Sequence, residues 1–441
     1  MALKYKMAGY LRDFTCIGGE CEDTCCKGWD IRFDQKHYEL LEAAVRQQGG
    51  AESKTLRRYV KVNEPESRTE QNYALLTLQK NGACPFLQTD GWCRLHKKFG
   101  VKPLSNICAY FPRVLSRYGD TVEMSGALSC PEIVRQCLFS EQGMELVPFE
   151  PDILPRPDDY PLTRELDLPT GEYYYEQFLA VREVLLKLLE LEGFPLSSRL
   201  YFLSSFASRL GPFYHHEAEA QHRSQLKKEL ERALQVSTLE RLNEFASRYV
   251  SADPVAIIVV QAILQLRVQH YPDEPHTRLV QDILRHYEQN LPAPLQHATL
   301  DGALPAAEMW TLFQQQQAKI DKAFGLELEH CLSRYLYNCL LREWFITMPD
   351  LFTYIHMLTI RIAILRFLLY SHPAIITLAE QQAATDASSD DLTALRKELV
   401  KVVYLHSRAI DHNTSFLKVV YDAINEQQMM NFEYALPFIR F

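Results

Sequence analysis

The cysteines of this chain are crowded into one stretch. Of the 11 cysteines in its 441 residues, Cys137, Cys331 and Cys339 are scattered, and the other eight fall between positions 16 and 130. These eight are Cys16, Cys21, Cys25, Cys26, Cys84, Cys93, Cys108 and Cys130. Zinc and iron-sulfur clusters each need about four anionic sulfur donors brought to one point. The clustering therefore predicts a site for zinc or an iron-sulfur cluster, with these eight residues as candidate ligands.

A disulfide framework explains the cysteines less well. A chain of 441 residues can bury a large core and needs no covalent staple. Disulfide frameworks belong mainly to small secreted domains, and the first residues, MALKYKMAGYLRD, carry charges where a secretory signal needs an apolar run. We therefore expect reduced thiols and a cytoplasmic protein.

The charge is distributed unevenly along the chain. The net charge is -9, yet residues 1–140 hold 20 lysine and arginine residues against 16 aspartate and glutamate residues. Nucleic acids select cationic surfaces, so the acidic remainder argues against a nucleic-acid partner. The slight positive excess around the cysteines suits either an anionic thiolate-bound cofactor or an ordinary basic surface.

Local patterns in residues 1–145 predict a small α+β module. Residues 29–33 alternate apolar and charged side chains, which favours a short strand, and Asp34 can then cap a helix. Residues 73–78 favour another strand, and the segment 84–93 can form a hairpin that faces Cys84 toward Cys93. A further strand pair, residues 113–118 and 121–128, turns at Gly119-Asp120, while residues 49–71 are polar enough for a solvated excursion. The cysteines then lie at strand ends and turns.

The composition changes after this module. Residues 146–171 hold six prolines, which fix the backbone and remove hydrogen-bond donors, so we expect a linker without regular structure. Residues 172–441 have a helical period and predict an all-α domain. The family resemblance given below implies that this domain recognises the protein substrate. The expected helices span residues 173–191, 200–210, 218–234, 239–249, 255–268, 276–289, 308–324, 326–346, 351–370, 392–410 and 416–428.

Residues 351–371 are apolar and long enough to cross a bilayer. They carry His356, Arg361 and Arg366, and each charge at membrane depth costs about 2.5 to 3.5 kcal/mol. This stretch is therefore interpreted as a buried helix of a helical bundle, with no membrane partner.

The cysteine spacing does not match two common motifs. Zinc modules favour C-x2-C pairs, and none occurs here; the gaps of four, three and zero residues from Cys16 to Cys26 fit a larger cluster or two sites somewhat better. A radical S-adenosylmethionine motif, C-x3-C-x2-C, begins with Cys21 and Cys25 but fails at Gly28. A structural zinc module and an iron-sulfur site both remain open on spacing alone.

The order of the motifs resembles a known module. It begins C…C…CC, continues with the CPFL segment at Cys84 and a lone Cys93, and ends in PLSNICAYFP around Cys108. This order is similar to the YkgJ-type zinc- or iron-chelating cysteine module. Together with CCKGW at Cys25 and a long helical remainder, it resembles the bacterial flagellin lysine-N-methylases. The gaps at the start are longer than in the usual chelating module, and Lys102-Pro103 stands where Arg-Pro is common.

The resemblance implies an activity and its cofactors. It implies transfer of a methyl group from S-adenosylmethionine to the ε-amine of surface lysines on flagellin, with a 4Fe-4S cluster associated with the cysteine module. Favoured ligands are Cys21, Cys25 or Cys26, Cys84 or Cys93, and Cys108. The alternative is a non-enzymatic zinc- or iron-binding or redox-sensing module with a helical domain that docks a partner.

The catalytic and cofactor-binding residues stay unassigned at this point. No G-x-G-x-x-G loop occurs, so the common nucleotide-binding crevice is not expected, and an open iron could instead bind the amino and carboxylate groups of S-adenosylmethionine. His215, His216 and His222 do not form H-E-x-x-H. Cys331 and Cys339 are expected to pack in the core. The polar set Tyr404, His406, Arg408, Asp411 and His412 is expected to have core or capping roles.

Overall fold

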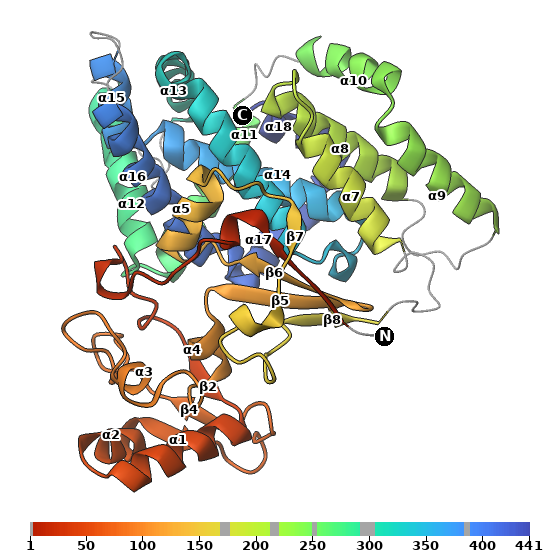
Figure 1. Ribbon diagram of the computed structural model, residues 1–441. Helices are drawn as coiled ribbons and strands as arrows, with labels where there is room; N and C mark the ends of the chain where they lie inside the picture. The colour runs from red at the N-terminus through yellow and green to blue at the C-terminus, as the bar shows by residue number, and fades with distance from the viewer. Residues whose placement is uncertain (1–2, 168–176, 212–219, 249–253, 292–304, 383–388) are drawn as a thin grey trace. The chain divides into compact units, whose positions relative to one another are not determined.

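The protein is described by a computed structural model that covers residues 3–167, 177–211, 220–248, 254–291, 305–382 and 389–441 (Figure 1). Contacts divide the chain into two compact units, Met1–Asp167 and Leu168–Phe441. The described residues are mainly helical, and all the strands that they contain lie in the first unit. The predicted fold class, a small α+β cysteine-rich module followed by an all-helical domain, is confirmed.

A five-stranded mixed sheet forms one half of the first unit. Its order is β7-β1-β6-β5-β8, in which β1 (Lys4–Ala8) pairs parallel with β6 (Thr121–Gly126). Strand β5 (Arg113–Tyr118) pairs antiparallel with β6 through the turn at Gly119-Asp120, as predicted. Helix α5 (Pro131–Phe139) follows this hairpin and buries Ile133, Val134 and Leu138.

A three-stranded antiparallel sheet forms the other half, in the order β2-β4-β3. Strand β2 (Ile31–Phe33) leads into α1 (Gln35–Gln48), and the Asp34 side chain accepts a hydrogen bond from the His37 N–H at 3.0 Å. This is the predicted N-cap. Strand β4 (Ala74–Leu76) is also as expected. Two short helices, α3 (Arg94–Phe99) and α4 (Asn106–Tyr110), were not predicted.

Residues 49–71 were predicted to form a solvated, irregular segment, and this prediction is wrong for the first half of the segment. Helix α2 (Ala51–Tyr59) and strand β3 (Val60–Val62) occupy it. Glu52 is buried in this helix because Lys98 and Arg94 neutralise its carboxylate, at 2.9 and 3.5 Å. A charged side chain can be buried when it is paired, and this pairing depends on tertiary contacts that local polarity does not reveal.

The expected linker also needs a correction. Strands β7 (Leu146–Pro148) and β8 (Arg164–Leu166) lie inside residues 146–171 and form the two edges of the five-stranded sheet. Edge strands tolerate proline because the backbone N–H groups on their outer side have no neighbouring strand to donate to. Between them, buried Arg156 donates to the carbonyl oxygen of Leu104 at 3.2 Å. This proline-rich segment is thus part of the first unit up to Asp167; residues 168–171 lie outside the described residues.

Every regular element described in the second unit is a helix. The core helix α14 (Leu351–Tyr370) lies among the other helices, and the long helix α13 (Ala306–Arg342) packs against it (Figure 1). The other α-helices are α7 (Phe178–Leu189), α8 (Leu196–Leu210), α9 (Ala220–Ala233), α10 (Val236–Arg248), α11 (Val255–His270), α12 (Pro275–Asn290), α15 (Pro373–Gln382), α16 (Ser389–His406), α17 (Thr414–Glu426) and α18 (Phe432–Ile439).

Two details of the helical unit differ from expectation. The two helices predicted at residues 308–324 and 326–346 form one continuous helix, because Gly325 keeps the helical conformation between them. Helices α15 and α18 were not predicted. The first residues of the expected helix at 173–191 lie outside the described residues.

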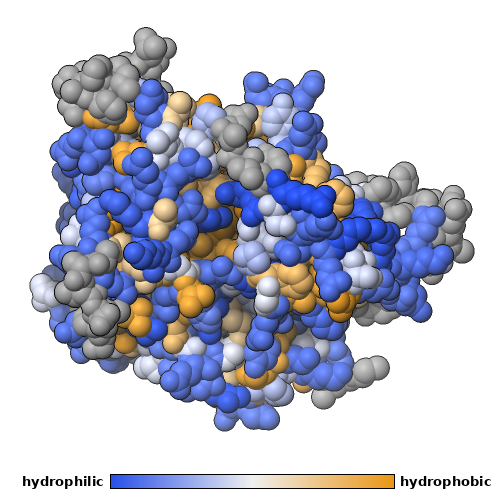
Figure 2. Space-filling view, turned by 90° about the horizontal axis from the view of Figure 1, so that it is seen from above, coloured by the Kyte–Doolittle hydropathy of each residue, from blue (hydrophilic) through white to orange (hydrophobic). Residues whose placement is uncertain are grey.

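Helix α14 is the one described helix that is long and apolar enough to cross a membrane by length and composition. Ninety-four percent of its apolar window is buried inside the helical unit. The face of the molecule drawn in Figure 2 is mostly hydrophilic, with hydrophobic groups scattered over it. The prediction of a buried bundle helix is therefore confirmed for α14.

Candidate functional sites

The eight clustered cysteines all lie in the first unit, and none of the 11 cysteines in the chain forms a disulfide. Cys16, Cys21, Cys25 and Cys26 lie on the irregular segment before β2, around the short 3-10 helix Gly18–Glu20. The others lie near later elements: Cys84 after β4, Cys93 just before α3, Cys108 in α4 and Cys130 just before α5.

The structure brings most of these cysteines into one region. Cys25 is close enough to interact electrostatically with five other thiols, those of Cys21, Cys84, Cys93, Cys108 and Cys130. Cys16 interacts electrostatically with the Cys21 thiol and with Arg113, and the backbone of Cys26 is joined to that of Cys84 by a 2.8 Å hydrogen bond. The segment from Cys84 to Cys93, predicted as a hairpin, forms a tight turn in which a single antiparallel β-bridge joins the backbones of Leu87 and Cys93.

Within the described part of the chain, no group of three or more Cys, His, Asp or Glu side chains is positioned to hold one metal ion. The chemistry of the donors nevertheless fits a soft metal, because several reduced thiols from separate loops face the same region. The eight predicted ligands are thus gathered, while their assignment as ligands stays a prediction.

Backbone N–H groups surround three of the sulfur atoms. Burial raises the thiol pKa of Cys84 to about 11 and of Cys130 to about 12, and it also raises that of Cys93. In each case two backbone N–H groups oppose this shift by favouring the thiolate. They belong to Phe86 and Leu87 at Cys84, to Leu95 and His96 at Cys93, and to Glu132 and Ile133 at Cys130. N–H groups that face sulfur are a feature of iron-sulfur sites, where they stabilise the anionic cluster.

Cys108 has the same character with a different partner. It keeps an exposed surface, but the protein atoms around its thiol desolvate it and raise its pKa to about 12. The Ser105 hydroxyl opposes this shift, and it also caps α4 by accepting a hydrogen bond from the Cys108 N–H at 3.3 Å. Trp29 packs edge-on against Phe111 at 4.8 Å, and its indole N–H donates to the Cys25 carbonyl oxygen at 2.6 Å. The motif residues around Cys25 and Cys108 therefore contact one another.

A second candidate site lies in the helical unit and was not predicted. Arg361, from the middle of α14, donates to both carboxylate oxygens of Glu343, at 2.9 and 2.7 Å. It also lies 3.4 Å from Asp411, whose two oxygens accept hydrogen bonds from the Tyr335 hydroxyl at 2.9 and 3.0 Å. We call Tyr335, Glu343, Arg361, His406 and Asp411 the buried polar cluster.

The backbone beside this cluster is unusual. Residues Ser407–Asp411 form a π-helix at the end of α16, a feature that is frequent at functional sites. Desolvation raises the pKa of Asp411, and Arg361 opposes that shift. Because Tyr335 and Arg361 already occupy its carboxylate, Asp411 is not an open base. The cluster therefore holds α13, α14 and the end of α16 together, which agrees with the core role expected for His406 and Asp411.

The remaining sequence candidates have simple outcomes. Cys331 and Cys339 are both buried in α13, as predicted for core packing. His215 and His216 lie outside the described residues, and so does the side chain of His222. The Tyr335–Asp411 contact joins residues 76 positions apart, so no local pattern could have revealed it.

The comparisons with known proteins agree on one family. Residues 182–438, more than half of the chain, match the family model described as the FliB lysine N-methylase C-terminal domain. The chain is 30% identical over 150 residues to the flagellar biosynthetic protein FliU of Salmonella muenchen. This match covers 31% of this chain and 78% of FliU.

Two further relatives carry the name lysine-N-methylase. They come from Salmonella choleraesuis strain SC-B67 and Salmonella typhimurium strain LT2, and each is 30% identical over 150 residues. These matches cover 31% of this chain and 33% of each relative, so the chain spans a third of their length. No solved structure matches the chain. From the family-model match and the similarity to FliU, we conclude that this chain belongs to the FliB lysine N-methylase family.

Proposed function

We propose that this protein is a protein-lysine N-methyltransferase that modifies surface lysines of flagellin, with S-adenosylmethionine as the methyl donor. The observation that carries the proposal is the family match over residues 182–438, which covers nearly all of the helical unit. The flagellar name of one relative and the lysine-N-methylase name of two others support a flagellar protein as the substrate.

The reaction places two requirements on the protein. The lysine must lose its proton, because an ammonium group has no free electron pair and the ordinary lysine pKa is about 10.4. The neutral nitrogen then forms a bond to the methyl carbon while the carbon–sulfur bond breaks and its electron pair stays on sulfur. The products are methyl-lysine, S-adenosylhomocysteine and a proton, so the reaction needs no oxidant or reductant.

We also propose that the cysteine region holds a 4Fe-4S cluster. Cys84, Cys93, Cys108 and Cys130 are the favoured holders, because hydrogen-bond donors beside each sulfur favour its thiolate and oppose the effect of burial. Cys25, which interacts with all four, is the favoured alternative. When bound, such a cluster supplies an electron-transfer or Lewis-acid centre. The thiols must release their protons to bind it, and the surrounding N–H groups favour that change.

The test combines metal content with methyl transfer. Anaerobically purified protein is expected to contain iron and sulfide, to absorb broadly in the visible range, and to transfer labelled methyl groups to flagellin. The Cys331→Ala variant is a matched control, because this cysteine lies in the helical unit and should leave the iron content unchanged. A colourless zinc protein with no transfer activity would favour the non-enzymatic metal module instead.

A further inference from the structure

A pocket of about 310 Å³ opens on the helical unit between α8, α13 and α14. Its polar walls come from Ser197 on α8, Asp321 and Glu329 on α13, and Arg366 and Tyr370 on α14. Its volume is at the lower end of the range that binds small ligands. All of its lining residues belong to described helices or to the residue just before α8.

Arg366 brings an uncompensated positive charge to this pocket. Among the described residues its guanidinium group has no ion-pair or hydrogen-bond partner, and its Nε atom is buried. Its Cζ atom lies 5.9 Å from the centre of the Tyr370 ring. Arg440, which interacts electrostatically with Arg366, is itself bound to uncharged groups, the Ser197 hydroxyl at 3.3 Å and the Ala246 carbonyl oxygen. An anionic ligand group would therefore gain a strong, charge-assisted hydrogen bond here.

Asp321 brings an uncompensated negative charge to the same pocket. Its carboxylate accepts a 2.6 Å hydrogen bond from the Tyr370 hydroxyl, but no cation of the described chain pairs with it. Glu329 differs, because Arg199 pairs with it at 2.7 Å and the Leu196 N–H donates to it at 3.0 Å. No ion pair joins Asp321 to Arg366, and Tyr370 contacts both. The pocket thus presents one open carboxylate and one open guanidinium group.

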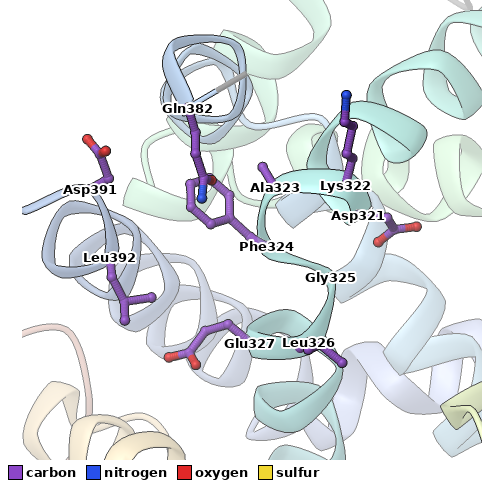
Figure 3. A pocket seen from close by; sticks show the side chains of 10 residues that line it. All are labelled: Asp321, Lys322, Ala323, Phe324, Gly325, Leu326, Glu327, Gln382, Asp391 and Leu392. Carbon is purple, nitrogen blue, oxygen red and sulfur yellow. The ribbon is translucent and has the colours of Figure 1, made fainter. Parts of the chain in front are cut away.

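A second hollow continues from this pocket over α13. It has a volume of about 490 Å³ and shares Asp321, Gly325 and Leu326 with the first. In Figure 3, Asp321 points to the opposite side of α13 from Gln382 and Asp391, while Gly325 leaves the backbone bare between them. A ligand with its charged end beside Arg366 can extend past Gly325 toward Phe324.

We propose that this pocket binds the α-amino-acid end of a ligand, with the carboxylate on Arg366 and the ammonium group on Asp321. Two sources share this chemistry, the methionyl end of S-adenosylmethionine and a free amino acid such as methionine. The first source rests on the proposed function. In that case protein side chains, and not an open iron, bind the amino and carboxylate groups of S-adenosylmethionine. The experiment below separates these two modes of binding.

The experiment measures ligand affinities by isothermal titration calorimetry of the full chain. The probes are S-adenosylhomocysteine, methionine and methylthioadenosine, which lacks the amino-acid end. Arg366→Gln is expected to weaken S-adenosylhomocysteine binding by about tenfold or more, as expected for the loss of a hydrogen bond to a charged group. Asp321→Asn is expected to act in the same direction, and it serves as the second variant because Asp321 is exposed and its substitution does not threaten folding.

Controls separate the pocket from general effects. Methylthioadenosine affinity should be the same in both variants and the wild type. Arg285→Gln should change nothing, because Arg285 lies on α12 in an exposed pair with Asp282. Methionine binding that is lost in Arg366→Gln, without binding of S-adenosylhomocysteine, would identify a free amino acid as the ligand.

The outcomes also separate this proposal from the proposed function. If the wild type methylates flagellin while Arg366→Gln and Asp321→Asn keep wild-type affinity for S-adenosylhomocysteine, the pocket assignment is overturned and the function stands. If the wild type binds the amino-acid probes through Arg366 but transfers no methyl group, the pocket stands and the function is overturned. If the wild type binds neither S-adenosylhomocysteine nor methionine, the pocket assignment is overturned.

Discussion

Arg361 and Glu343 form a bidentate ion pair inside the helical unit: each terminal guanidinium nitrogen donates to one carboxylate oxygen, at 2.9 and 2.7 Å. Arg361 lies in the middle of α14, a largely apolar helix, and Glu343 lies at the C-terminal end of α13. The pair therefore fixes the end of one core helix against the centre of another. Planar, paired geometry of this kind is what arginine provides and lysine does not.

We predict that Glu343→Gln destabilises the protein by about 3 kcal/mol, because it leaves the buried Arg361 charge with only the 3.4 Å contact to Asp411. Urea denaturation monitored by circular dichroism measures this loss. The matched control is Glu244→Gln, which breaks the exposed Arg248–Glu244 pair and should change stability by less than about 0.5 kcal/mol. Equal effects of the two substitutions would show that the buried pair has no special role.

A buried histidine should make stability depend on pH. His276 lies in α12, and among the described residues neither of its ring nitrogens has a hydrogen-bond partner; desolvation lowers its pKa to about 3, with His406 and Arg267 adding to the shift. Its folded-state pKa is below the ordinary value of 6.5, so the stability from this group is present above pH 6.5 and is lost as the pH falls toward 3.

We therefore predict that the unfolding free energy falls by up to about 1.4 kcal/mol per pH unit below pH 6.5 because of His276. His276→Leu should reduce this slope while keeping the fold, because leucine has no proton to bind. Denaturation midpoints at pH 7.5 and pH 5 provide the measurement. A variant with an unchanged slope would assign the pH dependence to other groups.

The cysteine region allows a prediction on metal removal. Single Cys84→Ser, Cys93→Ser, Cys108→Ser and Cys130→Ser variants should each lose most of the bound iron, and Cys331→Ala should keep it, because Cys331 is buried in α13 of the helical unit. Iron and acid-labile sulfide are quantified for each purified variant. Iron that stays at the wild-type level in all four variants would remove these residues from the ligand set.

Arg156 links the proline-rich segment to the cysteine region. It donates to the Leu104 carbonyl oxygen at 3.2 Å and to the Asn106 side chain, just before Cys108, and its own carbonyl oxygen accepts a 2.8 Å hydrogen bond from Tyr110. We predict that Arg156→Ala destabilises the first unit by about 2 kcal/mol, the scale of a lost hydrogen bond to a charged group. The variant should also release iron faster to a chelator, and unchanged release would show that this segment does not support the cysteine region.

Local chemistry was enough to predict part of the fold. The Asp34 cap, the Gly119-Asp120 turn and the helical period after residue 177 each depend on residues a few positions apart, and the structure contains all three. Helix α2 was missed because Glu52 is buried only with the help of Lys98 and Arg94, some forty residues away. The parallel pairing of β1 with β6 was also missed, because the two strands lie far apart in the sequence.

The sites divide in the same way. The eight cysteines stand out in the sequence because thiols are rarely clustered by chance. The structure brings five of them close enough to Cys25 to interact with it electrostatically. The sequence predicted core roles for His406 and Asp411, but it did not show that Tyr335, Glu343 and Arg361 join them, and it did not predict the Arg366 pocket. Asp321 and Arg366 belong to different helices, and their common exposure to one pocket is a result of how α13 and α14 pack.

Mass spectrometry of flagellin peptides, after incubation with this protein and S-adenosylmethionine, tests the central claim most directly. We predict that lysine-containing peptides gain methyl mass, that fragmentation assigns the gain to the lysine ε-nitrogen, and that omission of either the protein or the methyl donor abolishes it. Unmodified lysines after incubation with iron-loaded, folded protein would contradict the assignment of this chain as a flagellin lysine methyltransferase.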